Sequence, residues 1–207
     1  MLEVPVYNTD GRKIDTLQVD ERVFGGEPNI PLLKQAIVAY HANRRQGTVQ
    51  TKGRADVRGS TRKLYAQKHT GNARRGNIRT NIMKGGGMAF AKRPRDFRQK
   101  LSRNMRRAAL DSAILAKILG RDLMVVQGLK MESPKTARMA DVLRKLKVDR
   151  SCVLALAEPD RNIYLSARNI PDLTIRVTAE LNAFDVATRR KMLVTSEAMK
   201  ALMAEEA

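Results

Sequence analysis

The sequence predicts an α/β fold: a mostly parallel sheet covered by helices on both faces, with a long basic extended loop. In the second half of the chain, short continuous apolar runs alternate with stretches of helical periodicity, which is typical of strands buried on both faces. In contrast, residues 44–107 are strongly basic and show no sustained apolar period. We therefore expect residues 1–46 and 99–207 to form one globular α/β domain, and residues 47–98 to form the loop.

The first elements are a strand pair and a helix. Apolar residues flank an Asp10-Gly11 turn within residues 2–19, which indicates a β-hairpin. A helix is expected to begin near Pro31, because proline suits a first helical turn, and to end before Gly47. Its predicted buried stripe has the spacing i, i+3, i+4, i+7 and consists of Leu33, Ala36, Ile37 and Tyr40.

The chain re-enters the globular domain through a second predicted helix, residues 100–119, with Gly120 as its C-terminal stop. Its expected inner face consists of Leu101, Met105, Ala108, Leu115 and Leu119. Beyond it, strands are predicted at residues 123–126, 152–157, 173–177 and 192–195, and helices from Ser133-Pro134 through Leu146, at 160–168, near Phe184 and at 196–203.

The charge distribution is the main functional signal. Residues 44–107 hold 20 of the 40 Lys and Arg residues but only 2 of the 21 acids, so they carry +18 of the formal net charge of +19. With so few apolar residues, the segment is expected to be disordered in isolation. A polyphosphate backbone would order it, because each cation placed on a phosphate releases a condensed counterion.

Residue types within this segment favour RNA as the polyanion. Arginine outnumbers lysine, which favours forked contacts with phosphates, and Tyr65, Phe90 and Phe97 offer flat faces for unpaired bases. Gly85-Gly86-Gly87 is interpreted as a site of close backbone approach to RNA. The candidate RNA-binding residues are Arg44, Arg45, Lys52, Arg54, Arg58, Arg62, Lys63, Lys68, Arg74, Arg75, Arg79, Lys84, Lys92, Arg93, Arg95, Arg98, Arg103, Arg106 and Arg107.

Other classes of site find little support in the sequence. Cys152 is the single cysteine and lies in an apolar run, so it is expected to be buried. His41 and His69 have no partner at metal-ligand spacing, and the glycine-rich nucleotide signatures are absent. We expect no metal, no cofactor and no small-molecule substrate. The sequence has no run of 18 apolar residues, so no membrane span is expected. It also lacks a signal-peptide pattern, so the chain is expected to be cytoplasmic.

Catalysis on nucleic acid is the alternative function. Glu158 and Asp160 follow a predicted strand, where a parallel-sheet active site could form, although a polar turn with Asp160 as a helix N-cap is the simpler interpretation. A nuclease or RNA methyltransferase with a basic guide arm would depend on a metal or on S-adenosylmethionine. A third hypothesis, a nucleoid-type DNA binder, predicts equal affinity for duplex DNA and RNA.

Several ordered motifs resemble one known family over essentially the whole chain, the universal large-subunit ribosomal protein four family. The motifs are Thr51–Val57, Gln67–Arg74, Gly76–Arg79, Gly85–Phe90, Pro94–Phe97, Ser166–Pro171 and Asn182–Asp185. The sequence departs from the family pattern at His69, where a glycine is usual, at Asn72, where an arginine is usual, and at Tyr65-Ala66, where an aromatic-Arg pair is frequent.

The resemblance implies a structural constituent of the large ribosomal subunit, without enzymatic role or cofactor. It implies that the loop binds ribosomal RNA and aids subunit assembly, and that the loop tip, residues 63–74, lines part of the peptide exit tunnel. The expected partners are large-subunit ribosomal RNA, neighbouring large-subunit proteins and the nascent peptide. The tip residues carried over are Tyr65, Ala66, Gln67, Lys68, His69, Thr70 and Gly71.

Overall fold

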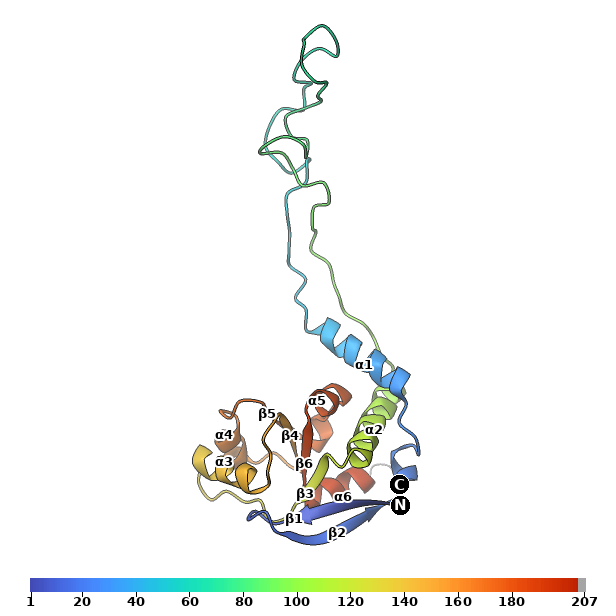
Figure 1. The fold of residues 1–207 in the computed structure, drawn as a ribbon, viewed down its shortest axis with the longest axis vertical. Coiled ribbons are helices and arrows are strands. Elements are labelled where there is room, and N and C mark those ends of the chain that lie inside the picture. Colours follow the sequence, from blue (N-terminus) through green and yellow to red (C-terminus); the bar gives the residue numbers. More distant parts are fainter. Residues whose placement is uncertain (205–207) are drawn as a thin grey trace. The chain divides into compact units, whose positions relative to one another are not determined.

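The computed structural model describes residues 1–204. The chain divides into two compact units, one formed by Met1–His41 with Gln99–Ala207 and the other by Ala42–Arg98. The six strands described within residues 1–204 belong to one sheet of the first unit (Figure 1). They are β1 (Leu2–Tyr7), β2 (Lys13–Val19), β3 (Leu123–Val126), β4 (Cys152–Leu156), β5 (Leu173–Val177) and β6 (Lys191–Thr195).

The strand order in the sheet is β2-β1-β3-β6-β4-β5. The β1–β2 hairpin is antiparallel, whereas β1 pairs with β3, β3 with β6, β6 with β4 and β4 with β5 in parallel. At the hairpin turn, the Asn8 side-chain oxygen accepts hydrogen bonds from the backbone N–H groups of Asp10 and Arg12, at 3.0 and 2.9 Å. The predicted mostly parallel sheet and its hairpin are therefore confirmed.

Helices cover both faces of this sheet, as predicted. Successive residues of β3 point to opposite faces: Leu123 and Val125 enter one core, and Met124 and Val126 enter the other. The first core is covered by α2 (Arg103–Leu119), α5 (Ala183–Thr188) and α6 (Ser196–Ala204), and the second by α3 (Thr136–Lys145) and α4 (Arg161–Ala167). Short 3₁₀ turns lie at Glu21–Phe24 and Thr178–Glu180.

Helix α2 differs from its prediction at both its start and its buried face. It begins at Arg103, because Ser102 caps it by accepting the Met105 N–H at 3.2 Å. Ala108 is exposed and Leu119 is 50% exposed, so the predicted inner face is wrong at these two positions. The buried residues are Ala109, Ser112, Ala113, Ile114, Leu115 and Ile118. Because the helix packs against both the sheet and α5, its buried face is wider than predicted and includes small residues.

Helix α1 (Ile30–Asn43) ends before Gly47, as expected. Of the predicted stripe, Ala36 is fully buried, whereas Leu33, Ile37 and Tyr40 are half-buried. At the end of α2, Gly120 occupies the C-cap but has right-handed torsion angles, and Arg121 takes the left-handed conformation with φ 54°. The stop was therefore predicted at the correct residue, although the backbone reversal occurs one residue later.

Candidate nucleic-acid interface

The second unit, residues 42–98, is a loop folded back on itself. Backbone hydrogen bonds join its two limbs, among them Arg95 N–H to Gly47 O at 3.1 Å, Thr51 N–H to Lys92 O at 3.0 Å and Met88 N–H to Lys52 O at 2.9 Å. Gly53 and Met88 form an isolated parallel bridge. Figure 1 shows the two limbs running side by side. The loop thus has an internal structure that the absence of apolar periodicity did not reveal.

Glycines make this close packing of the limbs possible. A Cβ on Gly47, whose φ is 73°, would lie 2.1 Å from Arg95 O, and a Cβ on Gly87 would lie 2.2 Å from Arg54 N. A Cβ on Gly86 would lie 1.8 Å from Thr80 O. These distances exclude any side chain without backbone movement. Gly86 and Gly87 therefore approach the chain itself closely, whereas a Cβ on Gly85 meets nothing within 4 Å. The approach of this glycine run to RNA stays a prediction.

The tip, residues 63–74, is closed by side-chain contacts. Lys63 Nζ donates to Gln67 Oε1 at 2.8 Å and to Arg75 O at 2.9 Å, and the Tyr65 hydroxyl donates to Ala73 O. His69 has a left-handed φ of 66°, a conformation that glycine adopts without strain. A histidine therefore occupies a backbone conformation that suits the glycine usual in the family it resembles.

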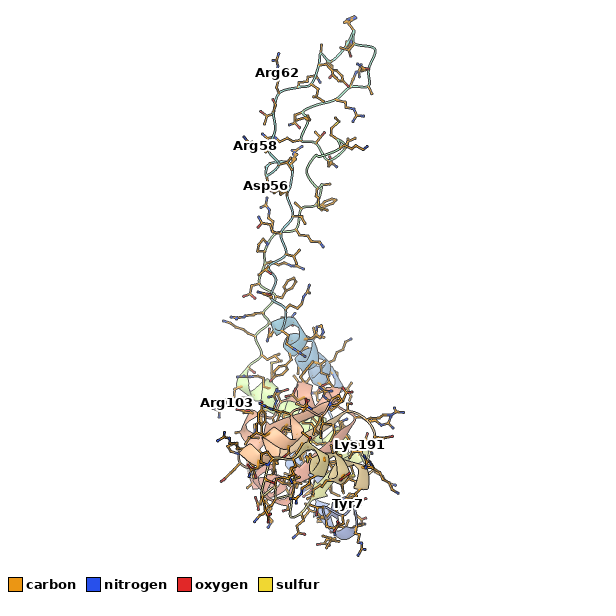
Figure 2. The ribbon with its side chains drawn as sticks, turned by 90° about the vertical axis from the view of Figure 1, so that its left-hand side faces the viewer. Tyr7, Asp56, Arg58, Arg62, Arg103 and Lys191 are labelled. Atoms are coloured by element: carbon orange, nitrogen blue, oxygen red, sulfur yellow. The ribbon has the colours of Figure 1, made fainter. Side chains whose placement is uncertain are left out.

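The predicted RNA-binding cations are displayed at the surface. Every one of the 19 is exposed except Arg79, which is half-buried, donates from Nη1 to Ala55 O at 3.2 Å and keeps a buried Nε without a partner. Arg58 and Arg62 project from the loop, and Arg103 projects from α2 (Figure 2). Arg79 therefore has an architectural role, and the other 18 side chains are exposed to solvent.

Both acids of the loop form hydrogen bonds with backbone N–H groups. Asp56 Oδ2 accepts the Gly53 N–H at 3.0 Å, and Asp96 Oδ1 accepts the Arg98 N–H at 2.9 Å. Carboxylates used in this way shape turns. Because only these two acids face 16 Lys and Arg residues within residues 42–98, the loop keeps a large positive charge.

The three aromatic rings of the loop have different environments. Two guanidinium groups lie over the Phe97 ring, with the guanidinium carbon of Arg45 at 3.6 Å and that of Arg95 at 4.3 Å from its centroid. Tyr65 is half-buried and hydrogen-bonded at the tip. Phe90 is 96% exposed. The sequence prediction treats the three rings alike, because it does not show which ring contacts another part of the folded loop.

The alternative catalytic site would lie in the globular unit, at the turn after β4. Asp160 is the N-cap of α4, accepting the N–H groups of Asn162 and Ile163 at 2.8 and 3.2 Å, while Glu158 is exposed. The structural interpretation of this turn is therefore confirmed. Within residues 1–204, no group of three or more His, Cys, Asp or Glu side chains is arranged to hold a metal ion.

Two further features of the globular unit bear on the sequence predictions. Cys152 is buried as expected, and burial raises the pKa of its thiol to about 12. Among the described residues, no helix has the length and apolar character needed to cross a membrane.

The fold and the loop define a class of protein: a parallel-sheet α/β domain with a long, folded-back cationic loop. Sequence comparison then identifies the family. Residues 17–205 match the model of the ribosomal protein L4/L1 family. The chain belongs to this family, so the resemblance inferred from its motifs is confirmed.

Individual relatives match over nearly their whole length. The chain is 42% identical to the large ribosomal subunit protein uL4 of Symbiobacterium thermophilum over 199 residues, which cover 96% of each chain. It is 43% identical to the protein of the same name from Pelotomaculum thermopropionicum, with the same coverage. The Brevibacillus brevis protein uL4 is 42% identical, again over 96% of each chain.

Proposed function

We propose that this protein is a structural constituent of the large ribosomal subunit in the cytoplasm, without cofactor or small-molecule substrate. In this proposal, residues 47–98 form a loop that penetrates ribosomal RNA and aids subunit assembly, while residues 1–46 and 99–207 form the globular domain. The tip from Tyr65 to Gly71 lines part of the exit tunnel and meets the nascent peptide. Neighbouring large-subunit proteins are its other partners. The relatives named above are large ribosomal subunit proteins, and the proposal includes no enzymatic role for this chain.

The observation that carries this proposal is the concentration of charge on one folded-back loop: with 16 Lys and Arg and 2 acids, residues 42–98 carry +14 of the formal net charge of +19. Exposed cations without balancing acids attract a polyanion, and counterion release makes that attraction strongly dependent on salt. Arginine supplies forked donors that match phosphate oxygens. Because both limbs carry exposed cations from Arg44 to Arg98, the loop can contact phosphates along much of its length.

The loop can be removed at a point that the structure defines. Gly47 O and Arg95 N are 3.1 Å apart, so residues 48–94 can be replaced by two glycines with little strain. The full-length and shortened chains are then titrated with deproteinised large-subunit ribosomal RNA between about 50 and 200 mM salt. We expect the full-length affinity to fall by about 10³-fold or more over this range, as for proteins with many phosphate contacts, and the shortened chain to bind weakly with a shallow slope.

Circular dichroism and thermal unfolding serve as the control, because the shortened chain should keep the α/β domain. A folded shortened chain with an unchanged salt slope would refute the assignment of RNA binding to the loop. A parallel competition between ribosomal RNA and duplex DNA separates RNA binding from nucleoid-type binding, which predicts equal affinities. Titration of the full-length chain with Mg²⁺ or S-adenosylmethionine, read as a thermal shift, tests the enzyme alternative, and we expect no shift.

A further inference from the structure

Phe90 is the aromatic ring that the loop leaves uncovered. Its 96% exposure contrasts with the half-buried Tyr65 and Phe97, which are engaged by a hydrogen bond and by two guanidinium groups. An exposed ring of this size is costly in water, since burial of a phenylalanine side chain is worth about 1.5–3 kcal/mol. A ring in such a position has a free face for a partner.

A cleft lies beside this ring, entirely within the loop unit. It has a volume of about 800 Å³ and lies between the limb of residues 45–49 and the limb of residues 90–97. Pockets of about 300–1,000 Å³ hold small ligands, so the cleft has room for a single nucleotide. Both cationic and apolar side chains line the cleft. Among them are Arg45, Val49, Phe90, Lys92, Arg93 and Arg95.

The lining has the two chemical features that a nucleotide requires. Phe90, an exposed ring in the lining of the cleft, offers a stacking surface for any base, and Lys92 and Arg93 are exposed donors within three residues of that ring. The guanidinium carbons of Arg45 and Arg95 lie 3.6 and 4.3 Å from the centre of the Phe97 ring, and this contact favours positions beside the cleft before any ligand arrives. A duplex cannot supply the free base face, because its bases are stacked on each other.

We propose that the cleft between residues 45–49 and 90–97 binds one unpaired nucleotide of the RNA, with its base stacked on Phe90 and its phosphate held by Lys92, Arg93, Arg45 and Arg95. This inference rests on the proposed RNA-binding function and adds a specific site to it. An apolar protein partner is the competing occupant of an exposed ring, but four cations around the cleft favour a phosphate-bearing ligand over an apolar one.

The chain contains no tryptophan, so a single introduced indole gives an unambiguous signal. Phe90→Trp places the reporter in the cleft, and Ile82→Trp places the same reporter at another exposed position of the loop, since Ile82 is 78% exposed. Both full-length variants are titrated to saturation with single-stranded poly(A), with a duplex RNA of the same length and with deproteinised large-subunit ribosomal RNA. We expect strong fluorescence quenching of Phe90→Trp by poly(A) and ribosomal RNA, and little by the duplex.

Equal quenching of the two variants, or equal quenching of Phe90→Trp by poly(A) and duplex, would overturn the proposal. Affinity provides the second measurement. Phe90→Leu keeps an apolar side chain but removes the aromatic face, and we expect it to weaken binding of ribosomal RNA roughly 5- to 150-fold, the range for loss of one stacked base. Ile82→Ala should bind as the unaltered chain does, and Phe90→Trp should retain full affinity.

The outcomes separate the nucleotide site from the proposed function. If the unaltered chain binds ribosomal RNA with a steep salt dependence while Phe90→Leu binds equally well, the cleft proposal fails and the RNA-binding function stands. If the unaltered chain shows no salt-dependent RNA binding, the function itself fails. If Phe90→Trp is quenched only when large-subunit proteins are added, the ring belongs to a protein interface and the nucleotide site is refuted.

Discussion

Arg176 Nε, on β5, lies 2.6 Å from Asp185 Oδ2, on α5. The same carboxylate oxygen accepts the Asn182 side-chain N–H at 2.9 Å, and Asn182 in turn caps α5 by accepting the Asp185 N–H at 2.9 Å. The hydrogen bond with Asp185 raises the pKa of Arg176 above its ordinary value. These hydrogen bonds explain the spacing of the polar residues within Asn182–Asp185. Each side chain pairs with a hydrogen-bonding group of another residue, and together they attach α5 to the edge strand β5.

Replacing Asp185 by alanine should therefore destabilise the globular domain. The carboxylate is only 14% exposed, and its removal leaves two donors unpaired, so we expect the unfolding free energy to fall by about 1–2 kcal/mol, discounted for the partly exposed arginine. Chemical denaturation measures the change. Asp141→Ala is the control: its pair with Arg144 has side chains 59% and 81% exposed, so a decrease within about 0.5 kcal/mol is expected. Equal decreases would contradict the role assigned to Asp185.

Gly87→Ala should disrupt the contact between the two limbs of the loop. Its Cβ would lie 2.2 Å from Arg54 N, whereas a Cβ on Gly76 meets nothing within 4 Å. We expect faster amide hydrogen exchange at Met88, whose N–H donates to Lys52 O at 2.9 Å, with unchanged thermal unfolding of the globular domain. Gly76→Ala should leave both properties unchanged. A protected Met88 amide in Gly87→Ala would show that the limbs do not depend on this glycine.

Neutralising two loop cations should reduce the salt dependence of RNA binding. Arg58 and Arg62 are exposed and project from the loop (Figure 2), so the double variant Arg58→Gln, Arg62→Gln should flatten the slope of log affinity against log salt by up to about 1.8, or about 0.9 for each phosphate that is no longer neutralised. Arg138→Gln, at an exposed position of α3, tests whether removing any positive charge has the same effect. An identical change in slope would show that RNA binding depends on the overall charge of the chain and not on the loop.

The Cys152 thiol should be inert in the folded protein. With a pKa of about 12, only about 10⁻⁴ of the thiol is ionised at pH 8, and the thiolate is the reactive form. We expect alkylation by iodoacetamide, followed by mass spectrometry, to require denaturant. Reaction of the native chain at the rate of the denatured one would show that the side chain is accessible.

The same burial makes stability sensitive to alkaline pH. The unfolded thiol loses its proton near its ordinary pKa while the folded thiol keeps it, so above about pH 9 the folded state binds more protons and the unfolding free energy falls as pH rises. Cys152→Ala removes this titration, so its unfolding free energy should decline less between about pH 9 and 12. A parallel decline in both proteins would assign the alkaline destabilisation to other groups.

The strands could be located from the sequence because their signal is local. Leu123–Val126 and Leu173–Val177 begin and end as predicted, since a continuous apolar run between polar turns has few alternative interpretations. The buried face of α2 was harder, because alanine and serine at positions such as Ala109 and Ser112 carry little hydrophobic signal. Position in the tertiary structure decided their burial.

The internal contacts of the loop could not be predicted from the sequence, for a different reason. The closeness of Gly87 to Arg54, and of Gly47 to Arg95, joins residues more than thirty positions apart, which no local pattern encodes. Composition correctly marked the segment as cationic, and the motifs identified the family. The distinction between Phe90 and the two engaged rings emerged only from the folded arrangement.

The position of the amino-terminal hairpin has a consequence for proteolysis. The segments before and after the loop share one sheet, with Val6 paired to Val125 and Tyr7 to Val126 in parallel, and Val4, Val19 and Phe24 share a core with Leu115. A trypsin cut among the exposed arginines would yield two fragments that cannot separate without exposing apolar surface. The nicked chain should elute as a single species under native conditions, and separately expressed halves should reassemble, so the molecule is a natural candidate for a split-protein design.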